Sequence, residues 1–180
     1  MRVLIIAIGR SGGTTLNSWL GLELGYKILN EPIWNKLSID ENDIVVKYHI
    51  GEIEEMTDID LTNWDKIIGL TREDSYDTAI SQYIGDQKNE WNCTYEVSDE
   101  WVKENQLNIK QVEERIIRNI ELIKEIKEIQ LLVTYEGIYN TKEDIQIIKD
   151  YIGISNTKFE HLLDNTNRLR NRDKTKRKLL

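Results

Sequence analysis

RVLIIAIGRSGGTTL, residues 2–16, joins a short apolar run to a turn rich in glycine and hydroxyl side chains. The run Arg2–Ile8 is aliphatic and short, as a buried strand is, and Thr14–Leu24 then places apolar residues at helical spacing before Gly25. A strand that leads through such a turn into a helix gathers backbone N–H groups at the positive end of the helix. The stretch therefore predicts a cradle for phosphate or sulfate at the start of an α/β fold.

The turn lacks the lysine found in the phosphate-binding loop of nucleotide triphosphatases. That loop reads G-x-x-x-x-G-K-[ST], whereas here Thr14 occupies the position of the lysine and Ile8 that of the first glycine. We therefore expect a turn that binds an anion but does not serve ATP hydrolysis.

Short aliphatic runs alternate with longer amphipathic stretches along the chain. The runs rich in Ile, Leu and Val are predicted to be buried parallel strands: Arg2–Ile8, Lys27–Leu29, Ile44–Tyr48, Lys66–Thr71 and Leu131–Tyr135. Helices are predicted over Thr14–Leu24, Ser75–Ile84, about Ile109–Ile129, and from Thr141, with Asp144 in a capping box, to Gly153. This alternation predicts a three-layer α/β/α fold with a mainly parallel central sheet, similar to that of P-loop nucleotide kinases.

Length and charge indicate one domain with a basic tail. With 180 residues, of which 39% are hydrophobic and 31% charged, the chain can bury one good core. We expect a single domain over residues 1–167, followed by a tail, 168–180, with seven Arg or Lys and one Asp. The tail carries +6 and the net charge is -8, which leaves -14 for residues 1–167. An acidic body argues against nucleic acid as the main partner.

Cysteine and histidine are scarce. Cys93 is the single cysteine, and His49 and His161 are the two histidines, so we expect no internal disulfide and no metal site. The N-terminal apolar run is shorter than a signal-peptide core, and no segment approaches the roughly 20 apolar residues of a membrane span. These observations predict a soluble cytoplasmic protein with no membrane partner.

Polar residues lie at or just after the end of each predicted strand, at the sheet edge where ligands bind in such folds. They are Arg10 to Thr15, Asn30-Glu31-Pro32, Lys47-Tyr48-His49, Thr71-Arg72-Glu73-Asp74 and Glu136-Gly137. Strand alternation puts Lys47 and His49 on the same side of the sheet. A cation, an imidazole and a carboxylate beside an anion cradle are suited to moving an anionic group with the help of a base.

The order of these signals resembles the PAPS-dependent sulfotransferases over residues 1–154. Arg10-Ser11-Gly12-Gly13-Thr14-Thr15 is similar to the family's [R/K]-S-G-x-T turn, and Lys47-Tyr48-His49 is similar to its K-x-H strand end. The family also has an arginine that is followed one helix later by a serine. Arg72 and Ser81, in LTREDSYDTAISQYI, resemble that pair. Val133-Thr134-Tyr135-Glu136, with Tyr151-Ile152-Gly153-Ile154 closing the next helix, is similar to the family's "YEDL … FLG" stretch.

The resemblance implies transfer of a sulfuryl group from 3′-phosphoadenylyl sulfate (PAPS) to a hydroxyl or amine acceptor, with adenosine 3′,5′-bisphosphate (PAP) as product and no metal. Arg10 would neutralise the leaving bridging oxygen, and Lys47 would aid the leaving sulfate. Arg72 and Ser81 would bind the 3′-phosphate, a task that suits the paired N–H donors of arginine. The 5′-phosphosulfate would lie against Ser11, Gly12, Gly13, Thr14 and Thr15.

Two features of the motifs leave alternatives open. Arg72 and Ser81 are nine residues apart, where many family members have eight, and the eight-spaced position is Glu73, whose charge would repel a phosphate. The base that takes the acceptor's proton is either His49, whose ordinary pKa of about 6.5 suits neutral pH, or Glu31, which matches the carboxylate of other branches.

Other functions and features stay open as well. A nucleotide or small-molecule kinase on the same scaffold is one alternative, and a catalytically degenerate nucleotide-binding module is another. The acceptor would be a small molecule or a glycan, and the sequence does not define the oligomeric state. Gly85–Gln106, with Trp91 and Trp101, is predicted to be either a packed loop or an acceptor wall.

Overall fold

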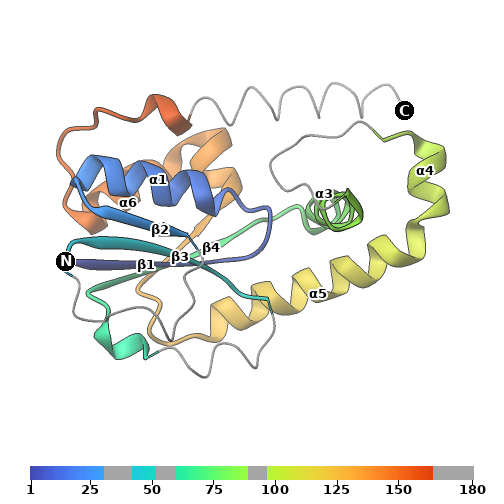
Figure 1. The fold of residues 1–180 in the computed structure, drawn as a ribbon, viewed down its shortest axis with the longest axis horizontal. Helices are drawn as coiled ribbons and strands as arrows, with labels where there is room; N and C mark the ends of the chain where they lie inside the picture. Colours follow the sequence, from blue (N-terminus) through green and yellow to red (C-terminus); the bar gives the residue numbers. More distant parts are fainter. Residues whose placement is uncertain (31–41, 52–59, 89–96, 164–180) are drawn as a thin grey trace.

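The computed structural model describes residues 1–30, 42–51, 60–88 and 97–163. Within these residues the chain forms a five-stranded, all-parallel sheet with helices on both faces (Figure 1). The strand order is β2-β3-β1-β4-β5. The bounds are β1 Arg2–Ala7, β2 Lys27–Asn30, β3 Ile44–His49, β4 Lys66–Thr71 and β5 Leu131–Thr134. The predicted three-layer α/β fold is confirmed.

After Arg2, the central strand β1 is wholly aliphatic because both of its faces are covered. In β1, Val3 and Ile5 belong to the core layer shared with α1 (Gly13–Leu24) and α6 (Glu143–Ile152). Leu4 and Ile6, on the opposite face, pack in the second core layer. All four side chains are fully buried, so an apolar run without alternation is what this position in the sheet requires.

The second face is covered by α5 (Gln106–Glu125), with α3 (Ser75–Lys88) packed against it and the short α4 (Asp99–Glu104) before it (Figure 1). Three isoleucines of α5 are buried in the second core layer, together with residues of α3 and of the sheet: Ile109, Ile116 and Ile123. The predicted end of this helix at Ile129 is wrong, because Ile126 takes an extended conformation and closes the helix after Glu125. No sequence pattern indicated α4, which Ser98 caps by accepting from the Trp101 N–H at 3.2 Å.

The capping box predicted for α6 is also wrong. Thr141 closes a π-helical turn, η3 (Gly137–Thr141), and Lys142, with φ of 63°, precedes the helix. Asp144 accepts from the backbone N–H of Thr134 at 2.9 Å, at the end of β5, instead of turning back to Thr141. Asp144 therefore binds a residue ten positions earlier in the chain instead of forming the predicted capping box with Thr141. The predicted C-terminus is confirmed, since Gly153 takes a left-handed conformation with φ of 86°.

Parallel strands bring their C-terminal ends to one edge of the sheet, and the register shows which ends are neighbours. Asn30 of β2 pairs with Lys47 of β3, and Ala7 of β1 pairs with His49. On the other side, Thr71 of β4 pairs with Thr134 of β5. This edge therefore carries the residues that follow the predicted strands. Among the described residues, no helix is both long and apolar enough to cross a membrane.

Candidate active site

The turn between β1 and α1 is shaped by its own backbone. Arg10 and Gly12 take left-handed conformations, with φ of 62° and 79°. The hydroxyl of Ser11, which is 1% exposed, donates to the carbonyl of Ile8 at 2.7 Å. Ser11 thus closes the turn on itself, and α1 begins directly after Gly12.

Gly12, at the end of the turn, and Gly13, the first residue of α1, are in close contact with other parts of the chain. A Cβ at Gly12 would lie 2.5 Å from Cε2 of Tyr139, and a Cβ at Gly13 would lie 3.0 Å from Cβ of Ala7. The Tyr139 hydroxyl also donates to the Gly12 carbonyl at 2.8 Å. Burial raises the pKa of Tyr139, which keeps this hydroxyl protonated. Tyr139, which lies in η3, is a supporting residue that the sequence did not indicate.

The N-terminus of α1 fits an anion. Within the described part of the chain no side chain caps it, and its first turn holds no acidic residue. The backbone N–H groups of a helix's first turn lack partners within the helix, and the helix dipole favours negative charge there. The exposed Thr14 and half-buried Thr15 add hydroxyl groups at this end.

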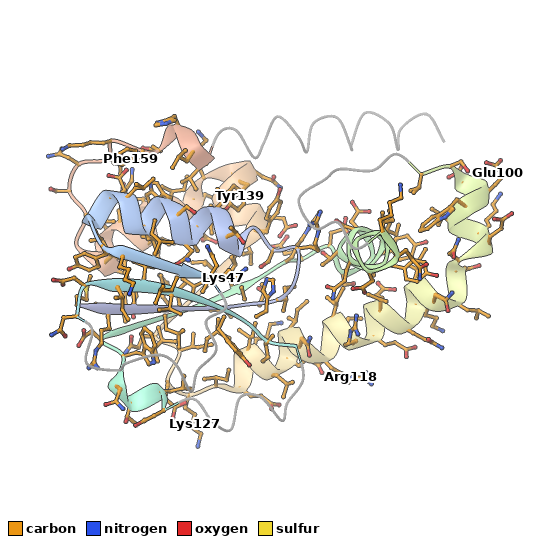
Figure 2. All side chains as sticks on the ribbon, in the orientation of Figure 1. Lys47, Glu100, Arg118, Lys127, Tyr139 and Phe159 are labelled. Atoms are coloured by element: carbon orange, nitrogen blue, oxygen red, sulfur yellow. The ribbon has the colours of Figure 1, made fainter. Side chains whose placement is uncertain are left out.

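Lys47 brings a cation to the turn from a distant strand. Its side chain extends from β3 on the face covered by α1, and its Nζ donates to Oγ1 of Thr14 at 3.0 Å (Figure 2). The residue is only 3% exposed. A buried ammonium favours a nearby anion strongly, because water screens it little. A lysine from β3 therefore contacts the residues at the start of α1, although the turn itself contains no lysine in its sequence.

Arg10, Arg72 and Ser81, which lie far apart in the chain, come together beside the turn. Arg10 Nε donates to the Ser81 hydroxyl at 2.8 Å, and Arg72 Nη1 donates to the Arg10 carbonyl at 3.2 Å. The exposed Glu73 lies in the segment between β4 and α3. The nine-residue spacing thus still places Arg72 and Ser81 around one residue, Arg10.

Two residues after β5 flank Arg72. Cζ of Arg72 lies 4.7 Å from the ring centre of Tyr135, and its Nε lies 3.7 Å from Oε1 of Glu136. The other carboxylate oxygen of Glu136 accepts from the Glu73 N–H at 3.0 Å. The Tyr135 ring is in turn 4.6 Å from that of Tyr139. One short segment therefore contacts both the glycine turn and Arg72.

Of the two candidate bases, the structure describes His49 but not Glu31. His49 ends β3, is half-buried, and shares the strand face of Lys47 by alternation. Glu31 lies outside the described residues, but the strand that leads to it is anchored: Asn17 Nδ2 donates to the Leu29 carbonyl at 2.9 Å and to Oδ1 of Asn30 at 3.0 Å. Asn17 is fully buried and was not identified from the sequence. Trp91 and the basic tail also lie outside the described residues.

The fold is an α/β fold of the sulfotransferase P-loop-like type, with the glycine turn after the first strand. Among solved structures, the chain is similar to mouse sulfotransferase SULT7A1 complexed with PAP, with a TM-score of 0.59 and 18% sequence identity. The likeness covers 93% of this chain and 62% of the mouse protein. At 18% sequence identity, this likeness shows that the two proteins share a fold. No protein-family model and no curated protein sequence matches the chain.

Proposed function

We propose that this chain is a sulfotransferase that transfers a sulfuryl group from PAPS to a hydroxyl or amine acceptor. The observation that carries the proposal is the set of cations around one glycine turn: Arg10 within it, Lys47 hydrogen-bonded to Thr14, and Arg72 hydrogen-bonded to the Arg10 carbonyl. The fold shared with a sulfotransferase that was solved with PAP supports the same conclusion.

The residues present fit a donor with two anionic ends. The uncapped start of α1, with Gly12 and Gly13, offers backbone N–H groups for the 5′-phosphosulfate. Arg72 and Ser81 both contact Arg10, and there a 3′-phosphate could meet a guanidinium and a hydroxyl. The donor would supply an activated sulfuryl group on a phosphate leaving group.

Each catalytic role follows from charge and position. As the S–O bond to the phosphate breaks, negative charge gathers on the phosphate oxygen, and Arg10 and Lys47 would stabilise it. As the acceptor oxygen or nitrogen bonds to sulfur, its proton would pass to His49 or to Glu31. Positioning and charge stabilisation supply most of the rate in such transfers, as they do in phosphoryl transfer.

We take the acceptor to be a small molecule or a glycan, and the protein to act in the cytoplasm. The net charge of -14 on residues 1–167 argues against nucleic acid as the main partner.

Incubation of the full chain with PAPS labelled with ³⁵S and a panel of phenols, sugars, amines and peptides tests the proposal. We expect label on at least one acceptor class, with one PAP released for each label transferred. Bound nucleotide without any turnover across the panel would favour a degenerate binding module. Transfer of the γ-phosphate of ATP to the same panel would favour the kinase. Either result contradicts the proposal.

A further inference from the structure

We propose that Glu136 is a built-in counter-ion of Arg72, and that it sets how strongly the chain prefers PAP over a nucleotide without a 3′-phosphate. The inference rests on the proposed function, because it takes the Arg72 end of the site as the place of the 3′-phosphate. It assigns to Glu136 a role in specificity that neither the motif resemblance nor the similar fold provides.

Arg72 is held from three directions, and the contact with Glu136 is the loosest of them. Its Nη1 donates to the Arg10 carbonyl at 3.2 Å, and its guanidinium lies over the Tyr135 ring. Its Nε faces Glu136 Oε1 at 3.7 Å, a distance within ion-pair range but too long for a hydrogen bond, and Nε makes no hydrogen bond with any described residue. The two side chains are only 14% and 13% exposed, so water screens this pair weakly.

Glu136 is anchored independently of Arg72. Its Oε2 accepts from the Glu73 backbone N–H at 3.0 Å, which ties the carboxylate to the turn after β4. An arriving phosphate that engages Arg72 through Nε must therefore share the guanidinium with a carboxylate that stays nearby. A paired N–H fork holds a phosphate best when its donors are not opposed by a second anion. Glu136 accordingly lowers the affinity of this end of the site for phosphate.

Glu136→Gln separates the charge from the anchoring contact. Glutamine matches glutamate in shape, and its Oε1 can still accept from the Glu73 N–H, so the turn is expected to keep its conformation. Calorimetry with PAP and with adenosine 5′-monophosphate, which lacks the 3′-phosphate, measures the effect. We expect the dissociation constant for PAP to fall about fivefold and that for adenosine 5′-monophosphate to change less than about twofold.

Glu121→Gln is the matched control. Glu121 is exposed on α5, which covers the face of the sheet opposite to that of Glu136, and the substitution changes the net charge by the same amount as Glu136→Gln. We expect both dissociation constants to stay at their wild-type values, and thermal melts by circular dichroism confirm that both variants fold. An unchanged or reduced preference for PAP in Glu136→Gln, with normal PAP binding by the wild type, overturns the inference alone. A wild type that binds PAP no better than adenosine 5′-monophosphate overturns the assignment of the 3′-phosphate end, and the inference with it.

Discussion

Arg10→Ala is expected to reduce sulfuryl transfer by about 10²- to 10³-fold while the protein stays folded. Arg10 is the cation of the glycine turn, and in the proposed mechanism it balances the charge that develops on the departing phosphate. That charge is largest in the transition state, so the loss should appear mainly in kcat rather than in the affinity for PAP. Labelled PAPS with the best acceptor from the panel gives both quantities.

Arg118→Ala is the control for this variant. Arg118 is exposed on α5, away from the turn, and its removal changes the net charge by the same amount (Figure 2). We expect it to transfer sulfate at the wild-type rate. A fully active Arg10→Ala protein, with the control equally active, would remove Arg10 from the mechanism.

Gly12→Ala is expected to destabilise the fold and to abolish PAP binding. Gly12 has φ of 79°, a conformation that costs an alanine about 1 kcal/mol. The new Cβ would also lie 2.5 Å from the buried Tyr139 ring, which is fixed by its own hydrogen bond to the Gly12 carbonyl. Overpacking of this kind adds about 1–3 kcal/mol. We therefore expect a loss of about 2–4 kcal/mol in the free energy of unfolding.

Gly25→Ala isolates the backbone contribution to this loss. Gly25 follows the C-terminus of the same helix, α1, and has φ of 69°. A Cβ added there would meet no heavy atom of the described residues within 4 Å. We expect this variant to lose only about 1 kcal/mol and to bind PAP normally. Urea unfolding of both variants compares the two losses. Equal losses in the two variants would show that the contact between Gly12 and Tyr139 is not tight.

The fold could be predicted from local patterns because its three central strands, β1, β3 and β4, are buried on both faces. Aliphatic runs marked β1, β2, β3, β4 and β5 to within about one residue at each end, and Gly25 and Gly153 marked helix ends through their left-handed conformations. The start of α6 could not be predicted in this way. Asp144, the apparent cap, instead binds the N–H of Thr134, and no local pattern reveals such a contact.

In the candidate site, too, the parts that are local in sequence could be predicted and the contacts between distant residues could not. The glycine turn is contiguous in sequence, so its conformation could be anticipated from the residues. The hydrogen bond from Lys47 to Thr14 spans 33 positions and that from Tyr139 to Gly12 spans 127, and both depend on how the chain packs. Motif order correctly suggested that Lys47 lies near the turn, but it contained no sign of Tyr139 or Asn17. The catalytic and binding roles of all these residues stay predictions.

Calorimetric titration of the full chain with PAP, beside an identical titration with ATP, tests the central claim most directly. PAP carries the 5′- and 3′-anions that the glycine turn and Arg72 are proposed to hold, and it needs no knowledge of the acceptor. We expect saturable binding of one PAP with a dissociation constant of about 10 μM or lower, and ATP binding at least about tenfold weaker. No heat from PAP at high micromolar concentration, together with clear binding of ATP, would contradict the central claim.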